Sequence, residues 1–507
     1  MFYTSTGYET YKKISLIILL LLFLFFVQYI ISGFGSSGEP SPKIEQTIPT
    51  ADLAEIKARG KIVALTENSS TSYFIYRGEP MGYEYEMLKM FAKDLNVDLE
   101  IRVVRDMNKI LELLIAGEAD IVAANMTVTK ERSSKVNFSN PLLITKQVLI
   151  QKKPENWQNM TQTELEKQLL RNPLELAEKE IYVRKESSFY SRLVNLSEEI
   201  GARILIMEAP GNTDTEQLIS KVANGKIPYT VADENIALLN QTYYPEIDVK
   251  TAISLPQKIS WAVRKDAGLL LTEINKWLQK KETKEKKAIL YSKYFKNSKD
   301  AIKRSESDYF SQNGGNISQY DNLIKKFSAK IGWDWRLVAA LICQESRFNH
   351  SAKSWMGASG LMQMMPETYS YFYADSIEIT PDLSIKAGTK YLLRRENYWK
   401  KYIFDKEERI KFVLASYNVG LGHVIDARRL AIKYNKNPNQ WDDNVAFFLL
   451  QKSYPEYYKD PVVKHGYCRG KEPVKFVKEI FRRYEHYKNT FNEDPLNETI
   501  AENSRKS

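Results

Sequence analysis

Cysteine and histidine are scarce in this chain of 507 residues, which contains two cysteines and four histidines. Two cysteines cannot build the disulfide framework on which small secreted scaffolds depend. Four histidines leave little material for a histidine-rich metal centre, and we expect neither a metal nor a cofactor. Long hydrophobic runs are also missing except for one, which excludes a protein with several membrane spans. The hydrophobic fraction of 43% is ordinary for globular domains and excludes wholesale disorder.

Charge of one sign is in excess in only one region. Residues 317–490 hold 29 Lys and Arg against 19 Asp and Glu, whereas the rest of the chain holds 44 of each. This region therefore accounts for the whole net charge of +10. A basic surface favours an anionic partner such as an acidic polymer, acidic lipid or nucleic acid, although it can also serve solubility alone. No recognisable nucleic-acid-binding motif is present, so we do not expect nucleic acid as a partner.

The one long apolar run covers residues 14–31 (ISLIILLLLFLFFVQYII) and carries no charge. As a helix it extends roughly 27 Å, enough for a bilayer core. Lys12 and Lys13 precede it, so the positive-inside rule places residues 1–13 in the cytoplasm and the remainder in the periplasm. We expect residues 14–32 to be an uncleaved anchor in the inner membrane. Cleavage as a signal peptide is the alternative, because a small-x-small pattern follows directly.

Beyond the apolar run, residues 33–55 are rich in Gly, Ser and Pro and predict a flexible tether. Between residues 56 and 297, short apolar runs alternate with amphipathic stretches, which is typical of parallel α/β sheets. Two such sets follow one another, and the chain then returns through residues 258–265 (KISWAVRK). This pattern predicts a bilobed, hinged α/β binding fold. The expected strands are 61–65, 99–104, 119–124, 180–185, 202–207 and 229–233, and the expected helices include 83–95, 107–117, 188–201 and 269–281.

The signals for strands disappear in the last part of the chain. Residues 298–316 are polar and contain glycine, which predicts a linker, and residues 317–490 then show helical periodicity throughout. A compact all-α domain follows from this pattern, and a disordered tail is expected at 491–507. The expected helices are 335–348, 385–401, 407–419, 422–434, 441–452 and 472–487.

One carboxylate stands out within this helical region. Asp334 is suited to cap a helix, and in the helix that follows Glu345 lies on the apolar face. A carboxylate on an apolar face is costly unless it is paired or protonated. Glu345 is therefore either a salt-bridged structural residue or a general acid with a raised pKa. The apolar positions on its face are Val338, Leu341, Ile342 and Phe348.

Four motifs in order surround this carboxylate, and together they resemble the lytic transglycosylases of the goose-lysozyme-like superfamily. Glu345 and Ser346 match the catalytic pair of that family, and residues 357–368 (GASGLMQMMPET) match its Gly-Leu-Met-Gln loop. The stretches 415–424 (ASYNVGLGHV) and 466–474 (GYCRGKEPV) complete the match. The resemblance implies a lysozyme-like fold and cleavage of peptidoglycan glycan strands, whose peptide carboxylates suit a basic domain.

The resemblance also implies a mechanism based on one carboxylate. In that family the glutamic acid protonates the β-1,4 oxygen between N-acetylmuramic acid and N-acetylglucosamine, and the N-acetyl carbonyl stabilises the oxocarbenium-like centre. The carboxylate then accepts the C6 hydroxyl proton, which closes a 1,6-anhydro ring without water. Glu345 takes this role here. We find no obvious second acid for hydrolysis in the motifs, since Glu367 follows Pro366 and looks structural.

The same match places further residues in the cleft. Ser346 is expected to orient the acetamide or the sugar, Met362 to offer an apolar contact, and other residues to donate hydrogen bonds to Glu345 or the saccharide. The hydrogen-bonding residues are Gln363, Tyr417 and Asn418. Cys343 and Cys468 lie in the same domain, so a disulfide between them is one interpretation. The favoured interpretation is that Cys343 is a small buried residue of the core.

Residues 56–297 resemble the family 3 solute-binding proteins, which serve uptake of polar amino acids. The matching stretches are 82–86 (GYEYE), 117–120 (GEAD), 127–132 (TVTKER) and 138–141 (FSNP). In that family the arginine of the third stretch forks the ligand α-carboxylate, which corresponds to Arg132. By the same match Thr127 and backbone near Ser187 assist, and Asp233 accepts the α-ammonium group. A surface salt bridge is the alternative for Arg132.

These observations predict an enzyme that cleaves peptidoglycan and carries a binding domain for an amino acid or a muropeptide-like ligand. Closure of the binding lobes on a ligand is expected to change access to Glu345. The alternatives are a solute receptor whose helical domain binds glycan without cleaving it, and a hydrolysing muramidase. No Walker loop, His-Glu-x-x-His or Gly-x-Ser-x-Gly pattern is present, so nucleotide-dependent, zinc-protease and serine-hydrolase functions are not expected.

Overall fold

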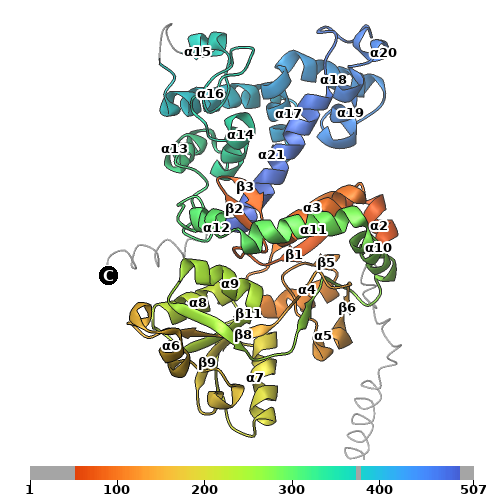
Figure 1. The fold of residues 1–507 in the computed structure, drawn as a ribbon. Coiled ribbons are helices and arrows are strands. Elements are labelled where there is room, and N and C mark those ends of the chain that lie inside the picture. Colours follow the sequence, from red (N-terminus) through yellow and green to blue (C-terminus); the bar gives the residue numbers. More distant parts are fainter. Residues whose placement is uncertain (1–51, 373–377, 492–507) are drawn as a thin grey trace, which may run out of the picture. The chain divides into compact units, whose positions relative to one another are not determined.

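The computed structural model describes residues 52–372 and 378–491 (Figure 1). The head at 1–13, the expected anchor at 14–32, nearly all of the tether and the tail beyond residue 491 lie outside the described residues. Predictions made for those segments stay predictions. Among the residues that are described, no helix is both long and apolar enough to cross a membrane.

The first lobe is built on a five-stranded sheet in the order β4-β1-β5-β14-β6. Strands β1, β4 and β5 run parallel, whereas β14 is antiparallel to β5 and to β6. The inner strand β1 is buried from Ile62 to Thr66, as expected for a parallel strand covered on both faces. The strands are β1 (Lys61–Thr66), β4 (Asp98–Val103), β5 (Ile121–Val122), β6 (Asn137–Phe138) and β14 (Ala262–Val263). The helices are α2 (Leu53–Ala58), α3 (Tyr83–Asp94), α4 (Ile110–Ile115), α5 (Lys130–Lys135), α10 (Gly268–Gln279) and α11 (Lys281–Tyr291).

The second lobe has its own five-stranded sheet in the order β10-β9-β11-β8-β12. Its strands are β8 (Gln147–Lys152), β9 (Glu180–Arg184), β10 (Leu205–Ala209), β11 (Tyr229–Asp233) and β12 (Ile247–Ala252). Its helices are α6 (Gln162–Gln168), α7 (Ser188–Glu199), α8 (Thr215–Ala223) and α9 (Glu234–Tyr243). The chain enters through β7 (Leu143–Thr145) and leaves through β13 (Gln257–Ile259), which pair antiparallel between the lobes. The predicted bilobed α/β fold with a return crossing is confirmed.

The last part of the described chain is all helical, as the sequence predicts. Its helices are α13 (Asp321–Ile331), α14 (Trp335–Ser346), α15 (Pro366–Phe372), α16 (Pro381–Trp399), α17 (Lys406–Val419), α18 (Leu421–Lys433), α19 (Ala446–Gln451), α20 (Pro455–Tyr458) and α21 (Lys471–Thr490). Helix α14 is buried along most of its length and packs against α13 and α21. The core helix that carries Glu345 is therefore held rigidly.

A short hairpin that the sequence did not suggest joins the two parts. Strands β2 (Phe74–Tyr76) and β3 (Glu79–Met81) pair around Gly78, and α21 reaches both of them (Figure 1). Residues 298–316, expected as a linker, begin with α12 (Ser298–Ser305). The segment after α12 pairs with the hairpin backbone, since Arg77 N donates to Tyr309 O and Ser311 N donates to Ile75 O. Backbone pairing thus ties this segment to the binding domain.

Candidate active site and ligand cavity

Glu345 lies in the last turn of α14, where the helix meets the Gly-Leu-Met-Gln loop. Asp334 caps the other end, since its Oδ1 accepts a hydrogen bond from Arg336 N at 2.9 Å. The helix ends at Ser346 because Arg347 adopts a left-handed conformation with φ 50°. This sharp ending leaves Glu345 partly exposed on an otherwise buried helix.

The electrostatic surroundings of Glu345 favour its protonated form. Desolvation is the main cause and the negative charge of Glu472 adds to it, so that together they raise the pKa of Glu345 to about 8. Glu472 lies in the first turn of α21. Although Glu472 belongs to the motif at 466–474, its effect could not be recognised from the sequence, because only the packing of α21 against α14 brings the two carboxylates together.

The Gly-Leu-Met-Gln loop is held by hydrogen bonds to its own backbone. Ser346 Oγ donates to Leu361 O at 2.8 Å, and Gln363 Nε2 donates to Gly360 O at 2.8 Å and to Ala352 O at 2.9 Å. Gln363 has φ 44°, a strained left-handed conformation that these bonds maintain. The amide nitrogen of Gln363 and the Ser346 hydroxyl therefore shape the loop in this structure.

Met362 does not occupy the position expected of it. Its side chain is fully buried, and its sulfur lies 2.2 Å from where a Cβ on Gly388 of α16 would be. The expected apolar contact with sugar has no exposed surface here, so we assign Met362 a packing role. Only glycine at position 388 leaves room for it. Its carbonyl oxygen accepts the Tyr417 hydroxyl.

Tyr417 and Asn418 come from the end of α17, and Tyr417 interacts with Glu345. Desolvation, followed by the charge of Glu345, raises the pKa of Tyr417 well above its ordinary value. Tyr417 is therefore a neutral hydroxyl close to the carboxylate, and its proton is directed at the Met362 carbonyl. Asn418 is partly exposed one residue further on.

A buried ion pair lies just beyond the third motif in the chain. Asp426 and Lys452 are both fully buried, with Oδ2 and Nζ 3.0 Å apart. Asp426 also accepts the backbone N–H groups of Lys464 and His465 at 3.0 and 2.7 Å. The stretch 421–426 is thereby tied to the chain that leads into α21 and Glu472.

The two cysteines are free and buried. The structure contains no disulfide between Cys343 and Cys468, and the favoured interpretation of Cys343 as a small core residue describes its position. Its Sγ lies 3.8 Å from Gly78 O in the β2–β3 hairpin.

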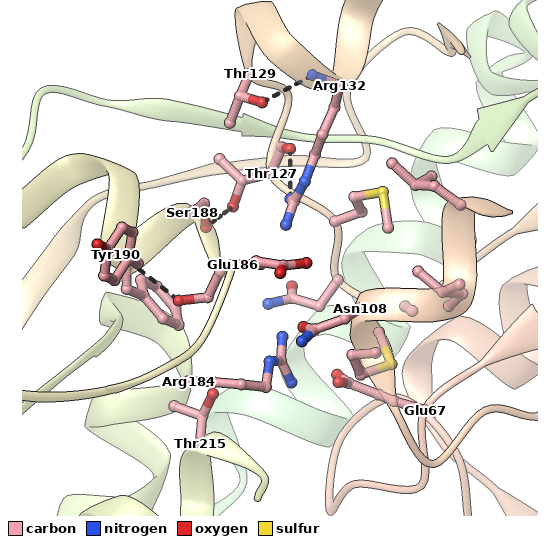
Figure 2. A pocket seen from close by; sticks show the side chains of 18 of the residues that line it. Glu67, Asn108, Thr127, Thr129, Arg132, Arg184, Glu186, Ser188, Tyr190 and Thr215 are labelled. Atoms are coloured by element: carbon pink, nitrogen blue, oxygen red, sulfur yellow. Dashed lines mark hydrogen bonds between the residues drawn. The ribbon is translucent and has the colours of Figure 1, made fainter. Parts of the chain in front are cut away.

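The first domain holds a cavity of about 500 Å³ between its lobes. Figure 2 shows Arg132 entering from one end, and Arg184, Thr215 and Glu67 at the opposite end. Side-chain hydrogen bonds cross from lobe to lobe around it. Asn125 Nδ2 donates to Asp233 Oδ2 at 2.9 Å, and Ser70 Oγ donates to Glu216 Oε1 at 2.6 Å. The lobes are therefore held together over the cavity.

The residues expected to bind ligand all line this cavity. Arg132 Nη1 donates to Thr127 O at 3.0 Å, and desolvation, aided by the Arg184 charge, lowers the pKa of Arg132 to about 10. Ser187 caps α7 by accepting Tyr190 N at 3.2 Å. Asp233 is the last residue of β11, and desolvation raises its pKa to about 7 despite the bond from Asn125. Within residues 52–372 and 378–491, no carboxylate forms the salt bridge considered for Arg132.

Sequence reasoning missed several charged residues of the cavity. Arg184 is the last residue of β9 and therefore lies at the carboxyl edge of the sheet. Its position three residues before Ser187 is the feature of the sequence that could have identified it. Glu67, Asp214 and Glu216 come from different lobes and meet only in the folded domain. Among the described residues, no cluster of His, Cys, Asp and Glu is suited to hold a metal ion.

Comparison with known proteins gives both domains a family. The profile of the bacterial extracellular solute-binding proteins, family 3, matches residues 62–297. The transglycosylase SLT domain profile matches residues 322–441.

Relatives share both domains over most of their length. A protein named membrane-bound lytic murein transglycosylase F from Desulfosudis oleivorans is 35% identical over 438 residues, which cover 85% of this chain and 91% of that protein. Its namesake from Saccharophagus degradans is 33% identical over 86% of this chain and 83% of its own length. An ancestral arginine-binding protein solved with arginine is 22% identical with a TM-score of 0.39, covering 47% of this chain and 99% of that one. A likeness that weak establishes nothing about the ligand here.

Proposed function

The chain belongs to the membrane-bound lytic murein transglycosylase F family, and from this membership we propose that Glu345 alone is the acid and base of its reaction. The protein is a peptidoglycan lytic transglycosylase with a solute-binding domain. The single observation that supports the role of Glu345 is its raised pKa of about 8 at the end of a rigid helix. A carboxyl group with that pKa still holds its proton at neutral pH and can donate it.

The reaction begins with transfer of the Glu345 proton to the β-1,4 glycosidic oxygen between N-acetylmuramic acid and N-acetylglucosamine. The C1–O bond breaks, and the N-acetyl carbonyl of the muramic acid stabilises the positive charge at C1. Glu345, now a carboxylate, accepts the proton of the C6 hydroxyl, whose oxygen bonds to C1. The products are a free 4-hydroxyl and a 1,6-anhydro ring, and no water is consumed.

The neighbouring residues position this carboxyl group. Tyr417 stays neutral beside it and is oriented by the Met362 carbonyl. Ser346 and Gln363 hold the loop against the end of α14. Asn418, partly exposed at the end of α17, is proposed to hydrogen-bond the saccharide.

Hydrolysis is the second candidate because Glu472 supplies a nearby second carboxylate. The two reactions differ in product, so mass spectrometry of muropeptides released from purified sacculi separates them. The full chain in detergent is expected to release anhydromuramyl products, and Glu345→Gln is expected to release none. Reducing-end products from the unaltered chain would instead identify Glu472 as a water-activating base. No release by either protein would point to the solute receptor that only binds glycan.

For the first domain we propose an amino acid or cell-wall peptide as ligand, with its α-carboxylate on Arg132 and its α-ammonium on Asp233. Asp233 Oδ1 is buried without a hydrogen-bond partner among the described residues, and it lines the cavity. Such an oxygen is costly unless a ligand donates to it. Thr127 and Ser187 flank the same position.

Ligand binding is proposed to regulate cleavage through the β2–β3 hairpin. Glu67 to Thr71 form part of the cavity wall, and the chain runs directly from there into the hairpin. At its turn, Gly78 O accepts Tyr487 Oη of α21 at 2.7 Å, and Cys343 lies two residues from Glu345. This continuous path joins the cavity to the helix that carries Glu345. Regulation along it would be allosteric if ligand binding and glycan cleavage are shown to be coupled.

Anchoring in the inner membrane through residues 14–32, with both domains in the periplasm, is the proposed location. It rests on the charge and length of the apolar run and on the names of the relatives. Peptidoglycan is the substrate that this location would offer.

A further inference from the structure

The ligand cavity of the first domain has a strongly uneven charge distribution. The residues that line it include more carboxylates than cations, and the excess of carboxylates is not evenly distributed along the cavity. Arg132 lies at one end, as Figure 2 shows, with Glu67 at the other. Electrostatic interactions link these groups. Asp233 interacts with both Arg132 and Glu67, and Glu67 also interacts with Asp214 and Glu216. We define Glu67, Asp214 and Glu216 as the acidic end of the cavity.

The acidic end is short of positive charge. Arg184 is the cation that interacts with Glu67 and Asp214, so the carboxylates outnumber it. Glu216 accepts hydrogen bonds from Ser70 and Glu67 accepts one from Ser72, all neutral donors. Desolvation, with the nearby Asp214 charge, raises the pKa of Glu216 to about 7, and desolvation also raises the pKa of Glu67. Three carboxylates drawn together from opposite lobes call for a cation.

A separate observation indicates that the cation comes from the ligand. Asp233 is only 2% exposed and its Oδ1 has no hydrogen-bond partner among the described residues. It lines the same cavity and interacts electrostatically with both Arg132 and Glu67. The cavity volume, about 500 Å³, lies in the range of sites for small molecules.

We infer that the cavity selects an α-amino acid whose side chain ends in a cationic amine, bound by Glu67, Asp214 and Glu216. This rests on the proposed amino-acid function of the domain and goes further by naming the charge of the side chain. The ligand spans the cavity with its α-carboxylate on Arg132, its α-ammonium on Asp233 and its second cation at the acidic end. A neutral side chain leaves the acidic end uncompensated, and an anionic one adds repulsion.

The test uses three amino acids of six carbons that differ only at C6. L-lysine ends in an ammonium group, L-norleucine in a methyl group and L-2-aminoadipate in a carboxylate. Titration calorimetry of the full chain in detergent is expected to give a Kd for lysine at least ~10-fold lower than for norleucine. Aminoadipate should bind more weakly than either.

Matched variants identify the residues responsible. Glu216→Gln keeps the acceptor for Ser70 while it removes the charge, and it should bring lysine and norleucine within ~3-fold of each other. Glu67→Gln is a second variant at the opposite wall, used in case the first one fails to fold. Glu112 also lines the cavity but is exposed, so Glu112→Gln should keep the preference for lysine.

Each outcome decides the inference. Norleucine or aminoadipate binding as tightly as lysine overturns it, while the amino-acid function of the domain stands. Binding of a purified muropeptide by a chain that ignores all three amino acids also overturns it and leaves the peptide form of that function. A chain that binds none of these ligands overturns both. Loss of lysine preference in Glu112→Gln but not in Glu216→Gln would place the cation elsewhere.

Discussion

As the proposed general acid, Glu345 must hold a proton when the glycosidic bond breaks, so its pKa should set the upper pH limit of activity. Since that pKa is about 8, kcat/KM should be sustained at neutral pH and fall as the pH rises through 8. Glu472→Gln removes a like charge, which lowers the pKa of Glu345 and moves the falling limb to lower pH. At pH 7.5, just below the pKa of the unaltered Glu345, we therefore expect a lower rate than that of the unaltered chain, measured as a pH profile of anhydromuropeptide release.

The control for that profile is Glu367→Gln, a change at an exposed glutamate after the Gly-Leu-Met-Gln loop. Its profile should coincide with that of the unaltered chain. A Glu472→Gln limb that stays in place would show that desolvation alone sets the pKa of Glu345. Loss of activity at every pH would instead assign Glu472 a direct part in the chemistry.

The Asp426–Lys452 pair supports stability and not chemistry. Burial alone would raise the pKa of Asp426, but hydrogen bonds from Lys464 N, Lys452 and His465 N lower it to about 2. The folded state therefore gains stability above pH ~4 and loses it as the pH falls toward 2. Asp426→Asn leaves the buried Lys452 ammonium without a carboxylate, although His423 Nδ1 still lies 3.1 Å from its Nζ, and should cost about 3–5 kcal/mol, measured by thermal unfolding.

Asp442 offers a matched control for this change. It pairs with Lys411 at 2.7 Å but is 66% exposed, so Asp442→Asn should cost no more than about 1 kcal/mol. Equal losses from both variants would contradict the assigned role of the buried pair.

At the scale of elements, the β2–β3 hairpin must fit closely against α21 and the end of α14. Gly78 has φ +77°, and a Cβ there would lie 2.7 Å from the Phe348 ring and 2.8 Å from Tyr487 Oη. Gly78→Ala should therefore displace the hairpin or α14 and lower kcat by about tenfold, because small misplacements of catalytic groups are costly. Turnover of sacculi with a parallel melting curve measures this.

Gly60→Ala is the control that separates the effect of backbone strain from the effect of the steric clash at Gly78. Gly60 has φ +66°, and a Cβ there would meet nothing within 4 Å, so the substitution carries the strain without the clash. We expect a loss of about 1 kcal/mol in stability with kcat unchanged. A similar fall in kcat from both variants would exclude the hairpin contact as the cause.

Local patterns predicted most elements but few of the contacts between them. The strand–helix alternation and the face that places Glu345 beside Val338 depend on neighbours in sequence, so the sequence was sufficient for both. The hairpin, the charge of Glu472 near Glu345 and the acidic end of the cavity depend on residues far apart in the chain. Met362 shows the same limit, because its burial follows from Gly388 on another helix.

At the scale of the whole molecule, the junction between the domains decides whether ligand binding reaches Glu345. Tyr487 of α21 binds Gly78 O at 2.7 Å, whereas Tyr484 of the same helix binds Asp334 Oδ2 at 2.9 Å within the helical domain. A ligand whose binding is coupled to this junction should change the rate of glycan cleavage at saturation, and should change the affinity for a glycan fragment by about 5- to 150-fold. Tyr487→Phe removes one contact across the junction and should reduce that ratio several-fold.

Tyr484→Phe is the matched control, since it removes a hydroxyl from the same helix without touching the binding domain. Its ratio of rates with and without ligand should equal that of the unaltered chain, even if its basal rate differs. The coupling between the two binding equilibria is reciprocal. If the ligand changes the affinity for a glycan fragment beside Glu345 by some factor, the bound fragment must change the Kd of the ligand by the same factor. Calorimetry of ligand binding with and without a bound glycan fragment measures this directly. A ratio of one in both directions would mean that the domains act independently and that the hairpin only joins them.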